Sequence, residues 1–219
     1  MRRETELPLY VYALSATGLP RRFTVLGRRL RAITIGGVDA IVGQRAPGRS
    51  IEDIQRQHEI VAALAARTPA LLPARFGSEI REDALRSLVS DREHDLRAAL
   101  KRVRNCQQMT IRVFGRSEAG AVQDVLPRSG AEYLARRRER ALREPAEAGV
   151  IRAVLSDLVK AERVEPGERG IRVTVFHLVA TPRLARYRQR ASTIQSSLAA
   201  ASVTVTGPWP PFAFAPELF

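Results

Sequence analysis

The sequence of 219 residues contains very little cysteine, histidine and lysine. The single cysteine, Cys106, excludes an internal disulfide and a zinc site built from several thiolates. Three histidines, His58, His94 and His177, leave few nitrogen ligands, so we expect neither a metal nor a cofactor. The sequence also lacks a run of about 20 apolar residues, which is the length that a membrane-spanning helix needs. We therefore expect a protein that is soluble in the cytoplasm.

The sequence motifs of common catalytic sites are also absent. The chain has no GxxxxGK[ST] phosphate-binding loop, no GxGxxG, no GxSxG and no HExxH. The cluster DREHD at residues 91–95 would point in several directions on a helix, which is typical of a solvated face rather than a metal site. His177 lies between Val175 and Val179 and is expected to be a core or edge histidine with satisfied hydrogen bonds. We predict that the protein is not an enzyme.

Basic residues exceed acidic ones, 36 against 23, which gives a formal net charge of +13. Arginine supplies nearly all of the positive charge, because Lys101 and Lys160 are the only lysines. Such a charge suits nucleic acid, an anionic membrane surface or an acidic protein. However, the excess is spread over both halves of the chain, and aromatic residues do not alternate with basic ones as single-strand binding requires. We interpret the charge as a solvated surface and keep a basic RNA- or DNA-binding α+β module as the alternative.

Residues 1–115 predict an N-terminal α+β domain. Hydrophobic patterning predicts strands at residues 7–14, 31–35, 38–42 and 109–114. It predicts helices at residues 51–68 and 81–104, the first with an apolar face of Ile51, Ile54, His58, Val61 and Leu64. Gly36-Gly37 is a tight hairpin signal, and Ser50 with Asp53 approximates a helix capping box. This order is compatible with a modified ferredoxin-like sandwich, in which both helices cover one face of an antiparallel sheet.

Residues 116–219 predict a C-terminal α+β domain with an antiparallel sheet and long helices. Ser129 and Glu132 form a capping box that opens the first of these helices. Further helices are expected at residues 150–159 and 181–198, and strands at residues 171–179 and 202–206. The sequence thus predicts two α+β domains that meet near residue 115.

Two segments are difficult to explain as plain scaffold. LPARFGS at residues 72–78 joins two helices and is too short and too rich in turn-forming residues for a regular element. GPWPPF at residues 207–212 holds the only tryptophan of the chain. Proline fixes its own φ and restricts the residue before it, so the second segment is stiff before it binds anything.

These two segments resemble the signature motifs of the gas vesicle protein F and L family, GvpF/GvpL. The family's core motif is similar to Leu-Pro-apolar-Arg-Phe-Gly-Thr, and its C-terminal ending is similar to Gly-Pro-Trp-Pro-Pro-Tyr. The stretches YVYAL, GGVDAIVG and GAEYLARRR also resemble family positions in the same order. The resemblance covers almost the whole chain, with Ala74, Ser78 and Phe212 as departures, and it does not separate the F type from the L type.

The resemblance implies a minor structural component of the gas vesicle that binds the hydrophobic shell protein, of the GvpA type, and other gas vesicle accessory proteins. An accessory protein that offers apolar grooves or free strand edges would keep such a shell protein from aggregating during nucleation. The resemblance also implies that the protein resides at the gas vesicle after a soluble period in the cytoplasm. We expect neither a membrane nor nucleic acid as a partner.

The two motifs supply the candidate residues for a structural or partner-binding role, namely Pro73, Arg75, Phe76, Gly77, Gly207, Pro208, Trp209, Pro210, Pro211 and Phe212. Arg75 either lies in the interior and holds loop carbonyls or a carboxylate, or forms a surface pair with Phe76 that recognises the shell protein. Trp209 and Phe212 either pack back on the chain and lock the last strand or the domain interface, or help to grip the shell protein. We expect no catalytic, cofactor-binding or metal-binding residue.

Overall fold

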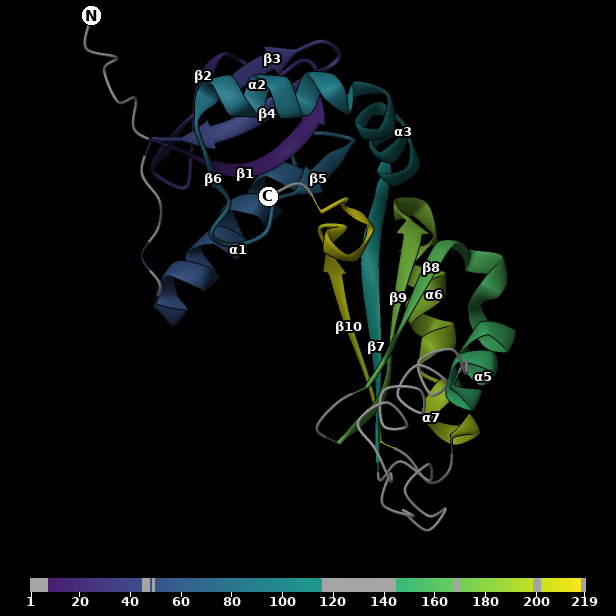
Figure 1. Cartoon of the computed structure of the whole chain (residues 1–219). Coiled ribbons are helices and arrows are strands. Elements are labelled where there is room, and N and C mark those ends of the chain that lie inside the picture. The colour runs from purple at the N-terminus through teal and green to yellow at the C-terminus, as the bar shows by residue number, and fades with distance from the viewer. Residues whose placement is uncertain are drawn as a thin grey trace, which may run out of the picture. The chain divides into compact units, whose positions relative to one another are not determined.

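The computed structural model describes residues 8–44, 48, 50–115, 145–167, 170–198 and 202–217, and it divides into two compact units (Figure 1). Unit 1 comprises Met1–Gln108 together with Trp209–Phe219, and unit 2 comprises Met109–Pro208. This division differs from the expected boundary at residue 115 in two respects. The chain passes from unit 1 to unit 2 after Gln108 rather than near residue 115, and Trp209–Phe219 belong to unit 1. Each unit has its own antiparallel sheet and helices, so the α+β class is confirmed.

The sheet of unit 1 is built around β1, whose first seven residues are all buried. The strands run in the order β2-β3-β4-β1-β5, and β6 pairs with β1 as well. The predicted hairpin is confirmed, with Ile35 opposite Val38 across Gly36-Gly37. The strands are β1 (Leu9–Ala16), β2 (Arg22–Val25), β3 (Arg28–Ile35), β4 (Val38–Gly43), β5 (Leu71–Pro73) and β6 (Glu79–Ile80).

Helices cover both faces of this sheet, which corrects the expectation of a single covered face. Leu30 and Arg31 are neighbours on β3 and therefore point to opposite faces. Leu30 belongs to a buried cluster with residues of α1, whereas Arg31 forms an ion pair of 2.5 Å with Glu82 of α2. The helices are α1 (Ile51–Ala65), α2 (Glu82–Asp91) and α3 (Glu93–Val103).

Two further expectations for the helices of unit 1 need correction. The predicted capping box of Ser50 and Asp53 is present, but Ile51 and Ile54 at the start of α1 are 70% and 47% exposed instead of buried. The single helix expected at residues 81–104 is two helices, because the backbone at Arg92 leaves the helical region (φ −114°, ψ 15°). A continuous apolar stripe in the sequence does not report such a break.

The LPARFGS segment contains regular structure after all. β5 and β6 flank its turn, and both pair antiparallel with β1. Such short strands gain their stability from the central strand beside them, so the sequence of the segment alone gives no strand signal.

In unit 2 the strands lie side by side in the order β10-β7-β9-β8. Along the chain, helices lie between β7 and β8 and between β9 and β10. This β-α-β-β-α-β arrangement is the ferredoxin-like one. The expected N-terminal sandwich needs correction at this point, since β7 was assigned to the first sheet and pairs in the second. The strands are β7 (Cys106–Phe114), β8 (Val159–Pro166), β9 (Ile171–Ala180) and β10 (Ser202–Trp209).

The helices of unit 2 are shorter than predicted. The helix expected to reach residue 159 ends earlier, and β8, which the sequence reasoning missed, begins at Val159. The helix expected to open at Ser129 lies outside the described residues. The described helical elements are α5 (Ala146–Leu155), η2 (Ser156–Leu158), η3 (Thr181–Arg183), α6 (Leu184–Ala191) and α7 (Ile194–Ser197).

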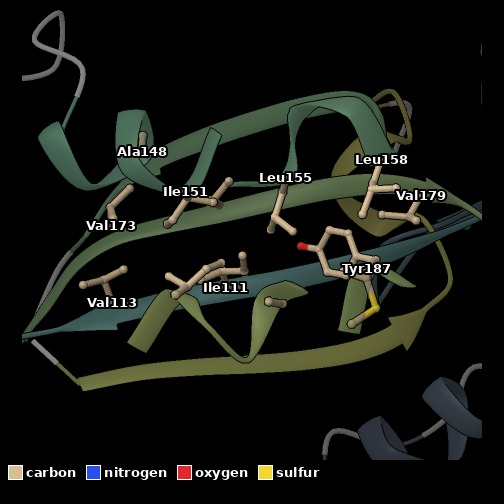
Figure 2. Packing of buried hydrophobic residues seen from close by; sticks show 13 residues of the cluster. Ile111, Val113, Ala148, Ile151, Leu155, Leu158, Val173, Val179 and Tyr187 are labelled. Atoms are coloured by element: carbon tan, nitrogen blue, oxygen red, sulfur yellow. The ribbon is translucent and has the colours of Figure 1, made fainter. Parts of the chain in front are cut away.

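Unit 2 buries a continuous apolar core between its sheet and α5, α6 and α7 (Figure 2). Ile111 and Val113 of β7 face Ile151 and Leu155 of α5, and the ring of Tyr187 fills one end of this layer. All five side chains are fully buried. In the described part of the chain, no helix has the length and apolar character needed to cross a membrane.

Candidate functional site

The centre of the LPARFGS segment is a tight turn. The backbone N–H of Ser78 and its hydroxyl both donate to the carbonyl of Arg75, at 3.3 and 2.7 Å. Gly77, at the third position of the turn, has φ +87°, a conformation that favours glycine in a type II turn. The turn is closed without the side chains of Arg75 and Phe76. Both therefore lie at the surface, and the side chain of Arg75 is 68% exposed.

The buried hydroxyl of Tyr10 holds this turn against the rest of unit 1. It accepts a hydrogen bond of 3.0 Å from the backbone N–H of Gly77 and donates to the side chain of Gln57 on α1. Burial raises the pKa of Tyr10, so its hydroxyl keeps the proton that it donates. The turn is thus fixed to both β1 and α1.

The C-terminal segment packs on unit 1 next to this turn. After β10, the chain forms the short helix η4 (Phe212–Phe214), which lies against β5 and joins the buried cluster around α1. The ring of His58 on α1 stacks on Phe212, with centroids 5.6 Å apart and planes 14° apart. It also meets the Trp209 ring edge to face at 5.2 Å. Pro210 and Pro211 are buried, whereas Trp209 remains 38% exposed.

Polar contacts fix the residues that follow the aromatic anchors. The backbone N–H of Ala213 donates to the side chain of Gln108 at 2.8 Å. Glu217 pairs with the guanidinium of Arg75, and its carbonyl accepts from Arg92 at 3.3 Å. The side chains of Arg75 and Glu217 are each about two-thirds exposed, so this ion pair adds little stability, on the order of 0–1 kcal/mol.

Large apolar side chains are exposed beside this site. Ile51 and Ile54 precede His58 at positions i and i+3 of one helix face, so the three residues form a row that ends at Trp209. Every large exposed hydrophobic residue that the structure describes belongs to unit 1, namely Leu26, Ile51, Ile54, Phe76 and Trp209.

Unit 2 contains a carboxylate, an imidazole and a hydroxyl in line. Nε2 of His177 lies 3.0 Å from a carboxylate oxygen of Glu162, and Nδ1 lies 2.8 Å from the Tyr187 hydroxyl. Arg152 pairs with the other oxygen of Glu162 at 2.5 Å. A neutral His177 satisfies every group, because Nε2–H donates to Glu162 and Nδ1 accepts from Tyr187.

The surroundings of His177 and Tyr187 indicate a structural role for these side chains rather than a catalytic one. His177 and Tyr187 are fully buried. Burial lowers the pKa of His177, although Glu162 opposes this shift, and burial raises the pKa of Tyr187. Neither ring is exposed to solvent, and the raised pKa keeps the proton that Tyr187 donates to His177. The expectation of a satisfied core histidine is therefore confirmed. Among the described residues, no group of three His, Cys, Asp or Glu side chains is placed to hold a metal ion.

The structure brings the two sequence motifs together in unit 1. Pro73 lies on β5 beside η4, and Arg75 reaches the segment through Glu217. The interior position considered for Arg75 is not observed, since the guanidinium is at the surface. Gly207 and Pro208 end unit 2, whereas the rest of GPWPPF belongs to unit 1.

Sequence reasoning missed several residues that complete this site. His58 carried one usable signal, because an imidazole on the apolar stripe of a helix needs a partner. The other residues carried none, since their partners lie far away in the sequence: Tyr10, Gln57, Gln108 and Glu217.

The chain is similar to gas vesicle proteins both in sequence and in fold. The sequence model of the family described as gas vesicle synthesis protein GvpL/GvpF matches residues 8–216. The fold is similar to the crystal structure of the gas vesicle protein GvpF from Anabaena sp. PCC7120, with a TM-score of 0.70, 15% identity, and coverage of 95% of this chain and 98% of that one. It is also similar to GvpF from Microcystis aeruginosa, with a TM-score of 0.72, 14% identity, and coverage of 96% and 99%. No curated protein matches the sequence significantly.

Proposed function

We propose a function from one premise: the chain belongs to the GvpL/GvpF family of gas vesicle synthesis proteins. Its role is therefore connected with the gas vesicle. In our proposal, the protein is a minor structural and accessory component that binds the hydrophobic shell protein and keeps it from aggregating during nucleation and assembly. It works by binding alone, without catalysis or a cofactor, and its place is the gas vesicle.

The physical need for such a protein follows from the shell itself. A subunit whose assembled surface excludes liquid water exposes a large apolar area before it assembles, and exposed apolar patches aggregate. A partner that covers part of this area for a short time removes the surface through which subunits associate wrongly. Such a partner needs apolar side chains that stay exposed in its own folded state.

The row that Ile51, Ile54 and His58 form on α1, with Trp209 at its end, is the observation that supports this proposal. Ile51 and Ile54 lie on consecutive turns of α1, where Ile51 is 70% exposed and Ile54 is 47% exposed. The exposed part of each isoleucine side chain adds no packing energy to the fold, whereas a partner that buries it would gain about 25 cal/mol for each Å² of apolar surface. The partly exposed Trp209 extends the row by one large aromatic ring.

The free edge of β10 is a less suitable docking surface for the shell protein. Two side chains from the helices of unit 2 already occupy outward-facing groups of this strand. Gln195 accepts from the backbone N–H of Val203 at 2.8 Å, and Arg188 donates to the carbonyl of Gly207 at 3.2 Å. Strand addition there would first break both bonds, so we place the contact on α1.

A binding experiment with the shell protein tests the proposal. The double variant Ile51→Gln/Ile54→Gln removes the apolar row at exposed positions and should leave the fold intact. The matched control, Ala62→Gln/Ala98→Gln, also places two glutamines on exposed helix positions of unit 1. We measure co-purification of the shell protein and the light scattering of shell protein that is diluted from denaturant.

The two variants should behave differently. The parent and the control should retain the shell protein and suppress scattering, whereas the Ile51→Gln/Ile54→Gln variant should lose both effects. If all three proteins bind equally, the contact is not on α1. If the parent binds no shell protein but binds RNA or DNA in the same buffer, the alternative of a nucleic-acid module replaces the proposal.

A further inference from the structure

We infer that the exposed side of α6, with the preceding turn η3, is a docking site for an acidic segment of a protein partner. This inference goes beyond the proposed function, because it concerns unit 2 and a charged contact rather than the apolar row of unit 1. It starts from the distribution of charge in the sequence. Residues 169–216 contain no aspartate or glutamate, and four arginines gather at positions 183, 186, 188 and 190.

The carboxylates of unit 2 that the structure describes already pair with arginines. Each of the four acidic side chains that the structure describes there forms an ion pair with an arginine outside the set 183, 186 and 188. The pairs are Glu147–Arg172 at 2.8 Å, Glu165–Arg163 at 2.9 Å, Glu162–Arg152 at 2.5 Å, and Asp157–Arg190. Three exposed arginines on η3 and α6, Arg183, Arg186 and Arg188, therefore have no carboxylate partner among the described residues.

Two of these arginines are held in place by backbone carbonyls. Arg183 donates to the carbonyl of Asp157 at 2.9 Å, and Arg188 donates to that of Gly207 at 3.2 Å. A carbonyl orients a guanidinium but does not neutralise its charge. In the part of the chain that the structure describes, Arg186 forms no hydrogen bond or ion pair, and it is exposed. The site therefore presents positive charge with part of its ordering already done, which lowers the entropy that a ligand must overcome.

The position of the arginines on the helix also indicates binding rather than stability. Arg183 and Arg186 lie at the N-terminal end of α6, where the helix dipole disfavours cations. The first turn has no acidic residue, and no side chain caps the helix. A sequence that served stability alone would place carboxylates there. The unfavourable placement is expected where a surface serves recognition.

Helix geometry places the arginines around one open face. Arg186 and Arg188 stand on either side of Tyr187, which points into the core, so they leave the helix on opposite sides of its exposed face. Between them that face carries Ala185 and Gln189, which are small or neutral. An extended acidic segment along this face would meet guanidinium groups on both sides.

The chemistry of the face favours carboxylates over nucleic acid. Single-stranded nucleic acid gains much of its affinity from stacking on exposed aromatic rings, and the one aromatic residue of α6, Tyr187, is fully buried. A guanidinium presents its donors in a planar fork that matches both oxygens of a carboxylate. We therefore assign the site to Asp- or Glu-rich protein segments.

A titration with a defined acidic peptide tests the inference. The probe is a fluorescein-labelled polyglutamate peptide, followed by fluorescence anisotropy, with a labelled single-stranded oligonucleotide of equal charge in a parallel titration. The test variant is Arg183→Gln/Arg186→Gln/Arg188→Gln. The control, Arg29→Gln/Arg102→Gln/Arg104→Gln, removes the same charge from exposed positions in unit 1. Arg186→Gln alone breaks no hydrogen bond or ion pair among the described residues and serves as the variant least able to disturb folding.

The expected result separates position from total charge. The test variant should bind the peptide about tenfold more weakly than the parent, Arg186→Gln about threefold more weakly, and the control within twofold of the parent. Equal losses in the test and control variants would overturn the inference, as would tighter binding of the oligonucleotide than of the peptide. The shell-protein experiment changes only unit 1, so the failure of either proposal is distinguishable from failure of the other.

Discussion

Trp209 tests whether the C-terminal segment is an integral part of unit 1. Complete truncation of a buried aromatic residue costs about 3–5 kcal/mol. Trp209 is 38% exposed, so roughly two-thirds of this contact is present, and Trp209→Ala should lower the free energy of unfolding by about 2–3 kcal/mol. Trp209→Phe keeps an aromatic edge against His58 and should cost less than half as much.

The measurement must show where in the structure stability is lost, as well as how much is lost. Urea unfolding is followed by far-ultraviolet circular dichroism, because Trp209 is the only tryptophan and the variants lack its fluorescence. Hydrogen exchange then reports where the structure loosens. We expect faster exchange in α1 and β5, which contact the segment, and unchanged exchange in α5 and β9 of unit 2.

Three outcomes would refute this reasoning. A loss below about 0.5 kcal/mol, the range of an ordinary surface substitution, would mean that the ring contact with His58 does not anchor the segment. Faster exchange confined to unit 2 would mean that the segment stabilises unit 2 rather than unit 1. Loss of shell-protein binding without loss of stability would assign Trp209 to the partner contact instead.

Four further perturbations follow from the contacts of the two units. Gly77→Ala should cost about 1–2 kcal/mol in urea unfolding, because φ is +87° while no atom lies within 4 Å of the added Cβ; an unchanged midpoint would contradict the strain. Arg75→Gln should change stability by less than about 1 kcal/mol, and a double-mutant cycle with Glu217→Gln should give an equally small coupling, since the pair is exposed. Tyr187→Phe leaves Nδ1 of buried His177 without a donor and should cost about 1–3 kcal/mol by thermal unfolding; no loss would exclude this hydrogen bond. Because the pKa of His177 is lowered in the folded state, its contribution is complete above about pH 6.5 and falls as the pH drops below that value, so the stability difference between the parent and His177→Gln should shrink in acid.

The success of sequence reasoning depended on how local each signal was. The capping box of Ser50 and Asp53 and the hairpin at Gly36-Gly37 involve neighbouring residues, and both are present. β8 was missed because its sequence breaks the alternation of a strand at Glu162 and Arg163, has few β-branched residues and follows a strongly helical segment. β5 and β6 are strands only because β1 lies beside them.

The candidate site shows the same limit more strongly. The two motifs were found from their unusual composition, but nothing in either motif indicates that one lies against β5 and α1. The exposure of Ile51 and Ile54 was also unpredictable, because helical periodicity identifies an apolar face but not how far the covering sheet extends along it. Contacts between residues more than 100 positions apart, such as Arg75 with Glu217, require the structure.

The return of Trp209–Phe219 to unit 1 has a consequence for synthesis on the ribosome. The 100 residues of Met109–Pro208 separate the two parts of that unit. At about 5–20 residues per second, translation needs roughly 5–20 s to pass from one part to the other. During this interval Phe212 has not been synthesised, so the ring of His58 and the apolar cluster beside it lack the contact with Phe212 that covers them in the folded protein. A nascent chain stalled in this interval should therefore be recognised by chaperones that bind apolar surface, and release of the complete chain should end that recognition.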